Sequence, residues 1–188
     1  LKGHFSGLFF EDFMNKIALE YIKKTLNNKK NLKNINEENI TDIIQHLKSL
    51  NKNDRNLRFG INVNDHWIEH YINNIDFQKN HFIAYSINSN IIGLCQIART
   101  NKNYIAEIAI SVLEEYQNIN IGKLLLVESV FFANEIGFDF ISIDYLINNY
   151  RIINWIKKTG LPIQRIGVEG KSVFPTISRQ DYLNIFEN

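Results

Sequence analysis

The residues best suited to bind a ligand or take part in a reaction form a polar loop between a predicted strand and a predicted helix. Residues 105–112 are rich in Ile, Ala and Val and contain one carboxylate, Glu107, which indicates a mostly buried strand with one functional or solvated side chain. Apolar residues then surround most of a predicted helix from Ile121 onward, and the first N–H groups of a helix lack intrahelical partners. Because the helix dipole adds to this effect, the connecting loop predicts a pyrophosphate site made largely by the backbone. An ordinary strand-to-helix connection is the alternative. The loop residues are Gln117, Asn118, Ile119, Asn120, Ile121, Gly122 and Lys123.

The order of these segments along the chain resembles the GNAT superfamily of N-acetyltransferases. The resemblance covers about residues 30 to 161 and is closest to the acetyltransferase domain of bacterial protein lysine acetyltransferases. In that group residues 50–59 resemble the segment that joins the first two helices. It implies an acyl-CoA-dependent N-acetyltransferase, with acetyl-CoA as the donor and a protein lysine or a small-molecule amine as the acceptor. The matching segments are residues 106–112, Tyr116 and Gln117 ahead of Asn120 and Gly122, the Leu-rich helix, Gly137-Phe138 ahead of a second strand, and Asn149 ahead of Lys158-Thr159-Gly160-Leu161.

The resemblance also implies roles for individual residues. Glu107 matches the general base, and partial desolvation beside apolar neighbours would raise its pKa toward a useful value. A structural ion pair or a solvated face is the alternative for this carboxylate. Asn149 would bind the pantetheine arm of the cofactor, or would simply cap a helix. Backbone N–H groups at a bulge in the strand would meet the acyl-CoA, and they belong to Ile110, Ser111 and Val112.

Two positions depart from the family pattern. Asn120 replaces the first Gly of the acyl-CoA loop; Asn adopts the left-handed conformation at some cost, and its side chain can crowd the phosphates. Ile156 stands where many relatives carry a Tyr as general acid, so another group must protonate the thiolate. The alternatives are Tyr145, Tyr150, Ser111 and water. These departures favour a second hypothesis, a non-catalytic acyl-CoA-binding or sensing domain.

The pattern of apolar and polar residues predicts a mixed α/β domain over residues 29–188, preceded by a helical extension over residues 1–28. The GNAT fold implies a central, mostly antiparallel, twisted sheet of six to seven strands flanked by helices. We expect helices at 13–27, 37–50, 66–75 (capped by Asp65), 121–136 and 149–159. We expect strands at 31–36, 81–88, 91–99, 103–112 and 138–145, a tight turn at Asn88-Ser89-Asn90, and a final hairpin of 163–168 and 173–177 around Glu169-Gly170.

Composition excludes several classes of protein. The 188 residues are 45% hydrophobic with only 2 Pro, which indicates a folded chain. The formal net charge of +1 offers no electrostatic case for binding nucleic acid or an acidic membrane. No run approaches the roughly 20 apolar residues that span a bilayer, so we expect a cytoplasmic protein. Cys95 is the only cysteine, which rules out an intramolecular disulfide and indicates a packed thiol.

Two clusters of polar residues are best interpreted as ordinary surface residues without a binding function. His66 and His70 are four residues apart on a predicted helix, but no third ligand is identifiable, so we expect no metal. A basic cluster near the predicted first helix is interspersed with Asn and not with aromatic residues, so a solvated helix end explains it better than RNA binding does. The cluster contains Lys23, Lys24, Lys29, Lys30 and Lys33.

The helical extension over residues 1–28 is either a surface for a homodimer or a cover for the core.

Overall fold

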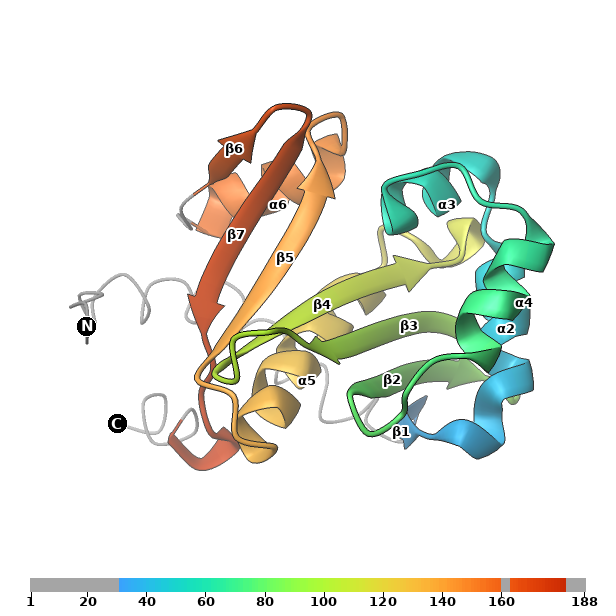
Figure 1. The fold of residues 1–188 in the computed structure, drawn as a ribbon, viewed down its shortest axis with the longest axis horizontal. Helices are drawn as coiled ribbons and strands as arrows, with labels where there is room; N and C mark the ends of the chain where they lie inside the picture. The colour runs from blue at the N-terminus through green and yellow to red at the C-terminus, as the bar shows by residue number, and fades with distance from the viewer. Residues whose placement is uncertain (1–30, 160–162, 182–188) are drawn as a thin grey trace.

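The computed structural model describes residues 31–159 and 163–181, which form a mixed α/β fold around one seven-stranded sheet (Figure 1). The strand order is β1-β2-β3-β4-β5-β7-β6, and β4 and β5 are the parallel neighbours in an otherwise antiparallel sheet. This confirms the predicted fold class. The predicted helix at 13–27 and the extension over residues 1–28 lie outside the described residues.

The elements have the following bounds. The strands are β1 (Leu32–Ile35), β2 (Asn80–Ile87), β3 (Asn90–Arg99), β4 (Ile105–Val112), β5 (Phe140–Leu146), β6 (Gln164–Ile166) and β7 (Glu169–Pro175). The α-helices are α2 (Ile40–Ser49), α3 (Lys52–Phe59), α4 (Asp65–Asn73), α5 (Ile121–Glu135) and α6 (Tyr150–Thr159). Short 3-10 turns precede α2 and follow β4, at η2 (Glu37–Asn39) and η3 (Glu114–Tyr116).

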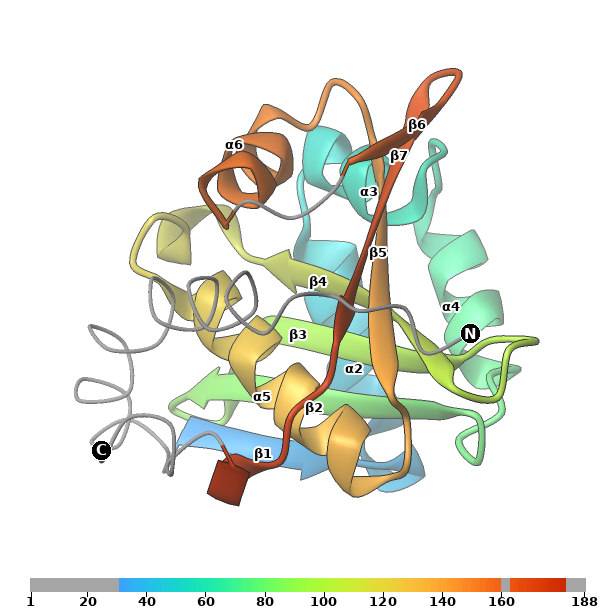
Figure 2. The same ribbon diagram turned by 90° about the vertical axis from the view of Figure 1, so that its left-hand side faces the viewer.

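Helices cover both faces of the sheet, and each face has its own apolar core. Figure 2 shows α5 in front of the sheet and α2 behind it. Side chains alternate along a strand, so Ile97 of β3 packs with the α5 cluster while Leu94 packs with α2 and α4. At Gly93 a Cβ atom would lie 2.8 Å from Ile121, which shows how closely the first turn of α5 approaches β3. This contact positions the loop that precedes α5.

The sheet divides into two parts between β4 and β5. These strands pair only from Ile105 with Phe140 to Ile108 with Ile143, and in Figure 1 β5 and β7 then rise away from β4. Neighbouring strands of a twisted sheet normally stay paired by backbone hydrogen bonds, so the end of this pairing is a local break in the ladder. The end of β4 therefore faces an opening instead of a neighbouring strand.

Residues 50–59 were expected only as a connection between two helices, and in the structure they contain α3. The Asn51 side chain accepts a hydrogen bond from the Asp54 N–H, and Gly60 ends the helix in the left-handed conformation at φ 74°. Both ends of this short helix are therefore capped.

The predicted cap of α4 and the predicted final turn are wrong by one to three residues. Asn64, not Asp65, caps α4, because its side chain accepts from the Trp67 N–H at 2.8 Å. The last hairpin turns at Gly167, whose φ is 61°, so Glu169 and Gly170 lie in β7. The predicted turn at Asn88 and Ser89 is confirmed, with positive φ values of 49° and 68° that match a two-residue hairpin connection.

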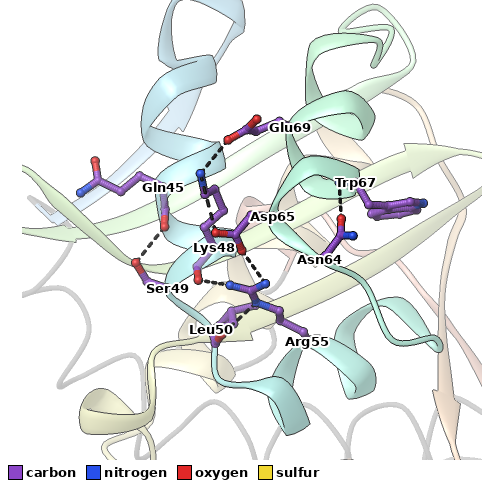
Figure 3. A network of polar contacts seen from close by, with 9 residues as sticks. All are labelled: Gln45, Lys48, Ser49, Leu50, Arg55, Asn64, Asp65, Trp67 and Glu69. Atoms are coloured by element: carbon purple, nitrogen blue, oxygen red, sulfur yellow. Dashed lines mark hydrogen bonds and ion pairs between the residues drawn. The ribbon is translucent and has the colours of Figure 1, made fainter.

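A polar network ties α2, α3 and α4 together (Figure 3). Arg55 of α3 donates from Nε to the Leu50 carbonyl at 3.0 Å, donates to the Lys48 carbonyl, and pairs with Asp65 at 2.7 Å. Lys48 pairs with Glu69 at 2.6 Å. These contacts satisfy carbonyl groups at the end of α2, and they hold α3 against the helices on its face of the sheet.

Candidate active site

A cavity of about 320 Å³ lies where β4 and β5 diverge. Its wall is formed by α3, the end of β4, the loop before α5 and the start of α6. Of the residues predicted to contact the cofactor, Ile119 does not line the cavity, and its side chain is 61% exposed. The others do: Ile110, Ser111, Val112, Gln117, Asn118, Asn120, Ile121, Gly122, Lys123 and Asn149.

The loop before α5 has the backbone expected of an anion site. Asn120 adopts φ 70°, so the residue that replaces the family Gly retains the left-handed conformation of that position. The Leu124 N–H donates to the Asn120 carbonyl at 3.0 Å, which starts the helix and leaves the preceding N–H groups at its open end. No acidic side chain lies in the first turn of α5. Phosphate therefore meets no competing carboxylate there.

Gln117 braces this loop against three other parts of the structure. Its side-chain amide donates to the Val112 carbonyl at 3.0 Å and to Asp54 of α3 at 2.8 Å, and its Oε1 accepts from Arg151. Arg151 and Asp54 also form an ion pair at 3.6 Å. Sequence reasoning missed Asp54 and Arg151, although Arg151 is only two residues after the predicted site residue Asn149.

The backbone at the end of β4 points into the opening. The Leu113 N–H donates to the Ile92 carbonyl at 2.9 Å on the β3 side, and the direction of these groups alternates along a strand. The N–H groups of Val112 and Ile110 therefore face the other way, toward the gap left by β5. The expectation of a bulge here is wrong for the β3 side, where the register runs unbroken from Gly93–Val112 to Arg99–Ala106. Divergence of β5, rather than an extra residue, frees these groups.

Asn149 precedes α6 and lines the cavity. Its Oδ1 accepts from the Ile152 N–H at 3.3 Å, so it makes the capping contact that we considered as the alternative. The two roles are compatible, because a side-chain amide that caps through its oxygen still has two N–H donors.

Glu107 lies on β4 just before the opening, on the face of the sheet opposite to α5. Its side chain is exposed, and it does not line the large cavity. Partial desolvation raises the pKa of Glu107, and the nearby Asp144 carboxylate raises that pKa further, while Lys171 and Arg58 oppose the shift. The ion pairs of the described residues do not include Glu107, which argues against a purely structural salt bridge.

A smaller cavity of about 70 Å³ extends between β4 and β5, beginning at the residue after Glu107. It is lined by segments 108–110 and 143–145 and by side chains of α3 and α6. Both cavities include Arg58, which sequence reasoning also missed.

The candidates for protonating a leaving thiolate lie in different environments. Tyr145 is buried and lines the smaller cavity, where its hydroxyl lies 3.3 Å from Ser172 Oγ. Tyr150 is 71% exposed and lines neither cavity. Ile156 is fully buried in the apolar core, so the position of the family Tyr has a packing role here.

Ser111 is engaged by a buried histidine on α2. His46 Nδ1 lies 2.9 Å from the Ile91 carbonyl and Nε2 lies 2.9 Å from Ser111 Oγ. Because a carbonyl only accepts, Nδ1 carries the hydrogen and Nε2 accepts from the Ser111 hydroxyl. Burial lowers the pKa of His46 to about 4, so the ring is neutral. The Ser111 proton is thus directed at His46, which weakens Ser111 as an acid.

In the described part of the chain, the cysteine thiol and the possible metal ligands form no second reactive site. Burial raises the pKa of the Cys95 thiol to about 12. Residues 31–159 and 163–181 contain no group of three or more His, Cys, Asp and Glu side chains arranged for a metal ion. Over the same ranges, no helix is long and apolar enough to cross a bilayer.

Comparisons with known proteins agree with this geometry. Residues 47–161 match the acetyltransferase (GNAT) family. One similar solved structure is the GNAT domain of PAT from S. lividans, with 16% identity and a TM-score of 0.65 over 77% of this chain and 89% of that one. A second is a GNAT-family acetyltransferase from Staphylococcus aureus Mu50, with 19% identity and a TM-score of 0.62 over 77% of this chain and 98% of that one. A third is a spermidine N-acetyltransferase from Vibrio cholerae in complex with CoA and spermine, with 14% identity and a TM-score of 0.60 over 82% of this chain and 99% of that one.

No curated protein sequence matches the chain. At these identities the solved structures establish the fold, whereas the family match covers more than half of the sequence and includes α3, β4, the loop and α6. The chain belongs to the GNAT family of acetyltransferases, which use acyl-CoA donors.

Proposed function

We propose that this protein transfers an acetyl group from acetyl-CoA to a primary amine, either a protein lysine or a small molecule, with Glu107 as the general base. The observation that supports this most directly is the cavity itself. It joins the open N-terminus of α5, the gap-facing backbone of β4 and Asn149. Glu107, whose pKa is raised, lies on β4 one residue before the segment that lines the smaller cavity.

The residues present fit an acyl-CoA. The N–H groups at the start of α5, from Ile121 to Lys123, would receive the pyrophosphate, and the Asn120 conformation keeps the loop open for it. The N–H groups of Ile110 and Val112 would bind the acyl and pantetheine carbonyls, with the free amide donors of Asn149 on the same arm. Acetyl-CoA supplies the activated thioester.

Transfer then requires three events at these residues. Glu107 accepts a proton from the acceptor ammonium, directly or through a water, and the neutral amine attacks the thioester carbon. The β4 N–H groups stabilise the oxyanion that forms as the new C–N bond is made. The C–S bond breaks, the thiolate takes a proton from Tyr145 or from water, and the proton that the new amide nitrogen loses passes through solvent to restore that donor. A raised pKa makes Glu107 a stronger proton acceptor than an ordinary glutamate.

A non-catalytic acyl-CoA-binding domain is the second candidate, and one observation favours it. Ile156 occupies the position of the family acid and is committed to the core. Such a domain would bind the thioester without turning it over.

The test combines calorimetric binding with turnover. Wild-type protein is titrated with acetyl-CoA, CoA and a longer acyl-CoA, and CoA release is then measured with a panel of amines. We expect Glu107→Gln to bind acetyl-CoA as the wild type does and to lose about 100-fold or more in turnover. Binding with no turnover for any amine supports the sensor, and absence of binding to every thioester rejects both functions.

A further inference from the structure

Arg58 is a partly buried cation whose side chain lines both cavities. It projects from α3, and its Nη2 donates to Gln96 Oε1 at 2.6 Å. Its Nε is buried and has no hydrogen-bond partner among the described residues. A buried donor without a partner costs free energy, and a buried charge costs more. This site is therefore unsatisfied in the free protein.

The surroundings of Arg58 hold it in place but do not neutralise it. Gln96 donates from Nε2 to the Tyr71 hydroxyl and to Asn80 Oδ1, both at 2.8 Å, so its Oε1 is fixed toward Arg58. The guanidinium carbon lies 5.0 Å from the Phe59 ring centroid. These partners are neutral. No carboxylate in the described ranges forms an ion pair with Arg58, and burial lowers its pKa.

Arg58 lies on the same side of the sheet as Glu107. Ala109 pairs with Gln96, the residue that holds Arg58, and side chains two apart on a strand share a face, which places Glu107 on that face as well. The two charges also interact: Glu107 raises the pKa of Arg58, and Arg58 lowers that of Glu107.

The carboxylate of Asp144 does not neutralise the charge of Arg58. Asp144 lines the smaller cavity, but its carboxylate is paired with Lys171 at 2.9 Å. Glu107 interacts with Arg58 but forms no ion pair with it, so the carboxylate of a ligand can complete the site. The gap-facing N–H groups suited to the donor lie at the edge of β4, whereas Arg58 and Glu107 both lie on the face covered by α3, which favours the acceptor as its source.

We propose that the acceptor carries a carboxylate near its amine, with Arg58 binding the carboxylate while Glu107 receives the ammonium proton. The acceptor class is then an amino acid or a related zwitterion. This inference rests on the proposed acetyltransferase function and narrows it. A planar guanidinium suits a carboxylate because two of its N–H groups can donate in parallel.

The test compares amino acids with the amines that lack only their carboxylate. Suitable pairs are glycine with methylamine, lysine with 1,5-diaminopentane, and 4-aminobutyrate with propylamine. We expect at least one acid to exceed its partner about tenfold or more in kcat/KM. Arg58→Gln should reduce that ratio to near one, because the acid loses its guanidinium partner and the amine has none to lose. Arg58→Lys should keep part of the preference.

Two controls separate this role from a structural one. Arg99→Gln removes a surface arginine that lies over Phe138, away from both cavities, and should leave the ratio unchanged. Acetyl-CoA binding by Arg58→Gln shows that the variant is folded. Equal losses for acid and amine in Arg58→Gln would reject the proposal, as would an Arg58-dependent preference for succinyl-CoA over acetyl-CoA.

Failure of the acetyltransferase function itself is recognised separately. If no amine of either kind is acetylated, calorimetry of the same amino acids against the CoA-bound protein still tests the site. Binding that Arg58→Gln abolishes supports a carboxylate site without turnover. No binding of any amino acid, together with no preference in turnover, overturns the inference.

Discussion

At the scale of single residues, Glu107 is the carboxylate that we propose as the general base. Its pKa is raised by desolvation and by Asp144, and a base acts only when deprotonated. We expect kcat/KM to fall as the pH drops through this pKa, at a higher pH than for an ordinary glutamate. Asp144→Asn removes a neighbouring negative charge and should move this fall to lower pH, as measured by pH–rate profiles with one acceptor.

The matched control for that experiment is Glu69→Gln, which removes a carboxylate of α4 that pairs with Lys48. Its profile should coincide with that of the wild type. An unchanged acid limb in Asp144→Asn would mean that Glu107 does not control the rate.

His46 predicts a pH dependence of stability. Its pKa is about 4 in the fold and about 6.5 in an unfolded chain, so the unfolded chain binds its proton first as the pH falls. The neutral ring therefore stabilises the fold above about pH 6.5, and about 3 kcal/mol of that stability is lost between there and about pH 4. Urea unfolding at several pH values measures this slope.

His46→Gln should be less stable at neutral pH, because Ser111 and the Ile91 carbonyl lose their partner, and its stability should depend less on pH over the same interval. The exposed His66 provides the comparison, since His66→Gln should keep the full slope. Parallel slopes for wild type and His46→Gln would refute the buried neutral ring.

At the scale of elements, the loop before α5 depends on one unusual backbone angle. Asn120 holds φ 70°, which glycine adopts freely and a β-branched residue adopts only with strain. Asn120→Gly should keep acetyl-CoA affinity within about threefold, whereas Asn120→Val should weaken it about five- to thirtyfold, from a strain of about 1–2 kcal/mol. Calorimetric titration measures both.

Ile119→Val is the control for these variants, because Ile119 is the adjacent loop residue that does not line the cavity. It should bind acetyl-CoA as the wild type does. Equal affinities of Asn120→Val and wild type would show that the left-handed angle is not needed for binding.

Local patterns were sufficient to predict most of the strands, α5 and the loop before it, whereas the arrangement of the strands in one sheet was implied by the family resemblance. The apolar run of α5 and the Gly at 122 are features of adjacent residues, so they can be recognised in sequence. The helix α3 was missed because Lys52–Phe59 is short and polar, and its existence depends on caps and on packing. The turn at Gly167 was predicted at Gly170 instead, because both glycines suit a turn. Position 170 requires a glycine for another reason: a Cβ atom there would lie 2.3 Å from the Tyr145 ring.

The site was predicted only as far as it is continuous in the chain. Residues of β4 and the loop were identified, but Arg58 and Asp54 reach the cavity through contacts that no pattern encodes. The hydrogen bond from Gln117 to Asp54 spans 63 residues of sequence. Such partners become visible only when the packing of α3 against β4 is known.

At the scale of the whole molecule, the divided sheet predicts how the cofactor affects stability. A ligand that binds only the folded state stabilises it by about 2.7 kcal/mol at 100 times its dissociation constant. We expect acetyl-CoA to raise the unfolding temperature. We also expect it to slow amide hydrogen exchange at the end of β4 and the start of α6, with little change in β2. Uniform slowing throughout the sheet would contradict a ligand held at the divergence.

The short helix α3 has a further consequence for how such a protein can change over evolutionary time. It is capped at both ends, it is pinned through Arg55 to backbone carbonyls, and it supplies Arg58 without contributing a strand to the sheet. In the proposed mechanism the donor contacts lie mainly on β4 and α5. A lineage could therefore acquire a new acceptor by substitution at position 58 of this eight-residue helix, while Asp54 keeps its hydrogen bond to the loop before α5.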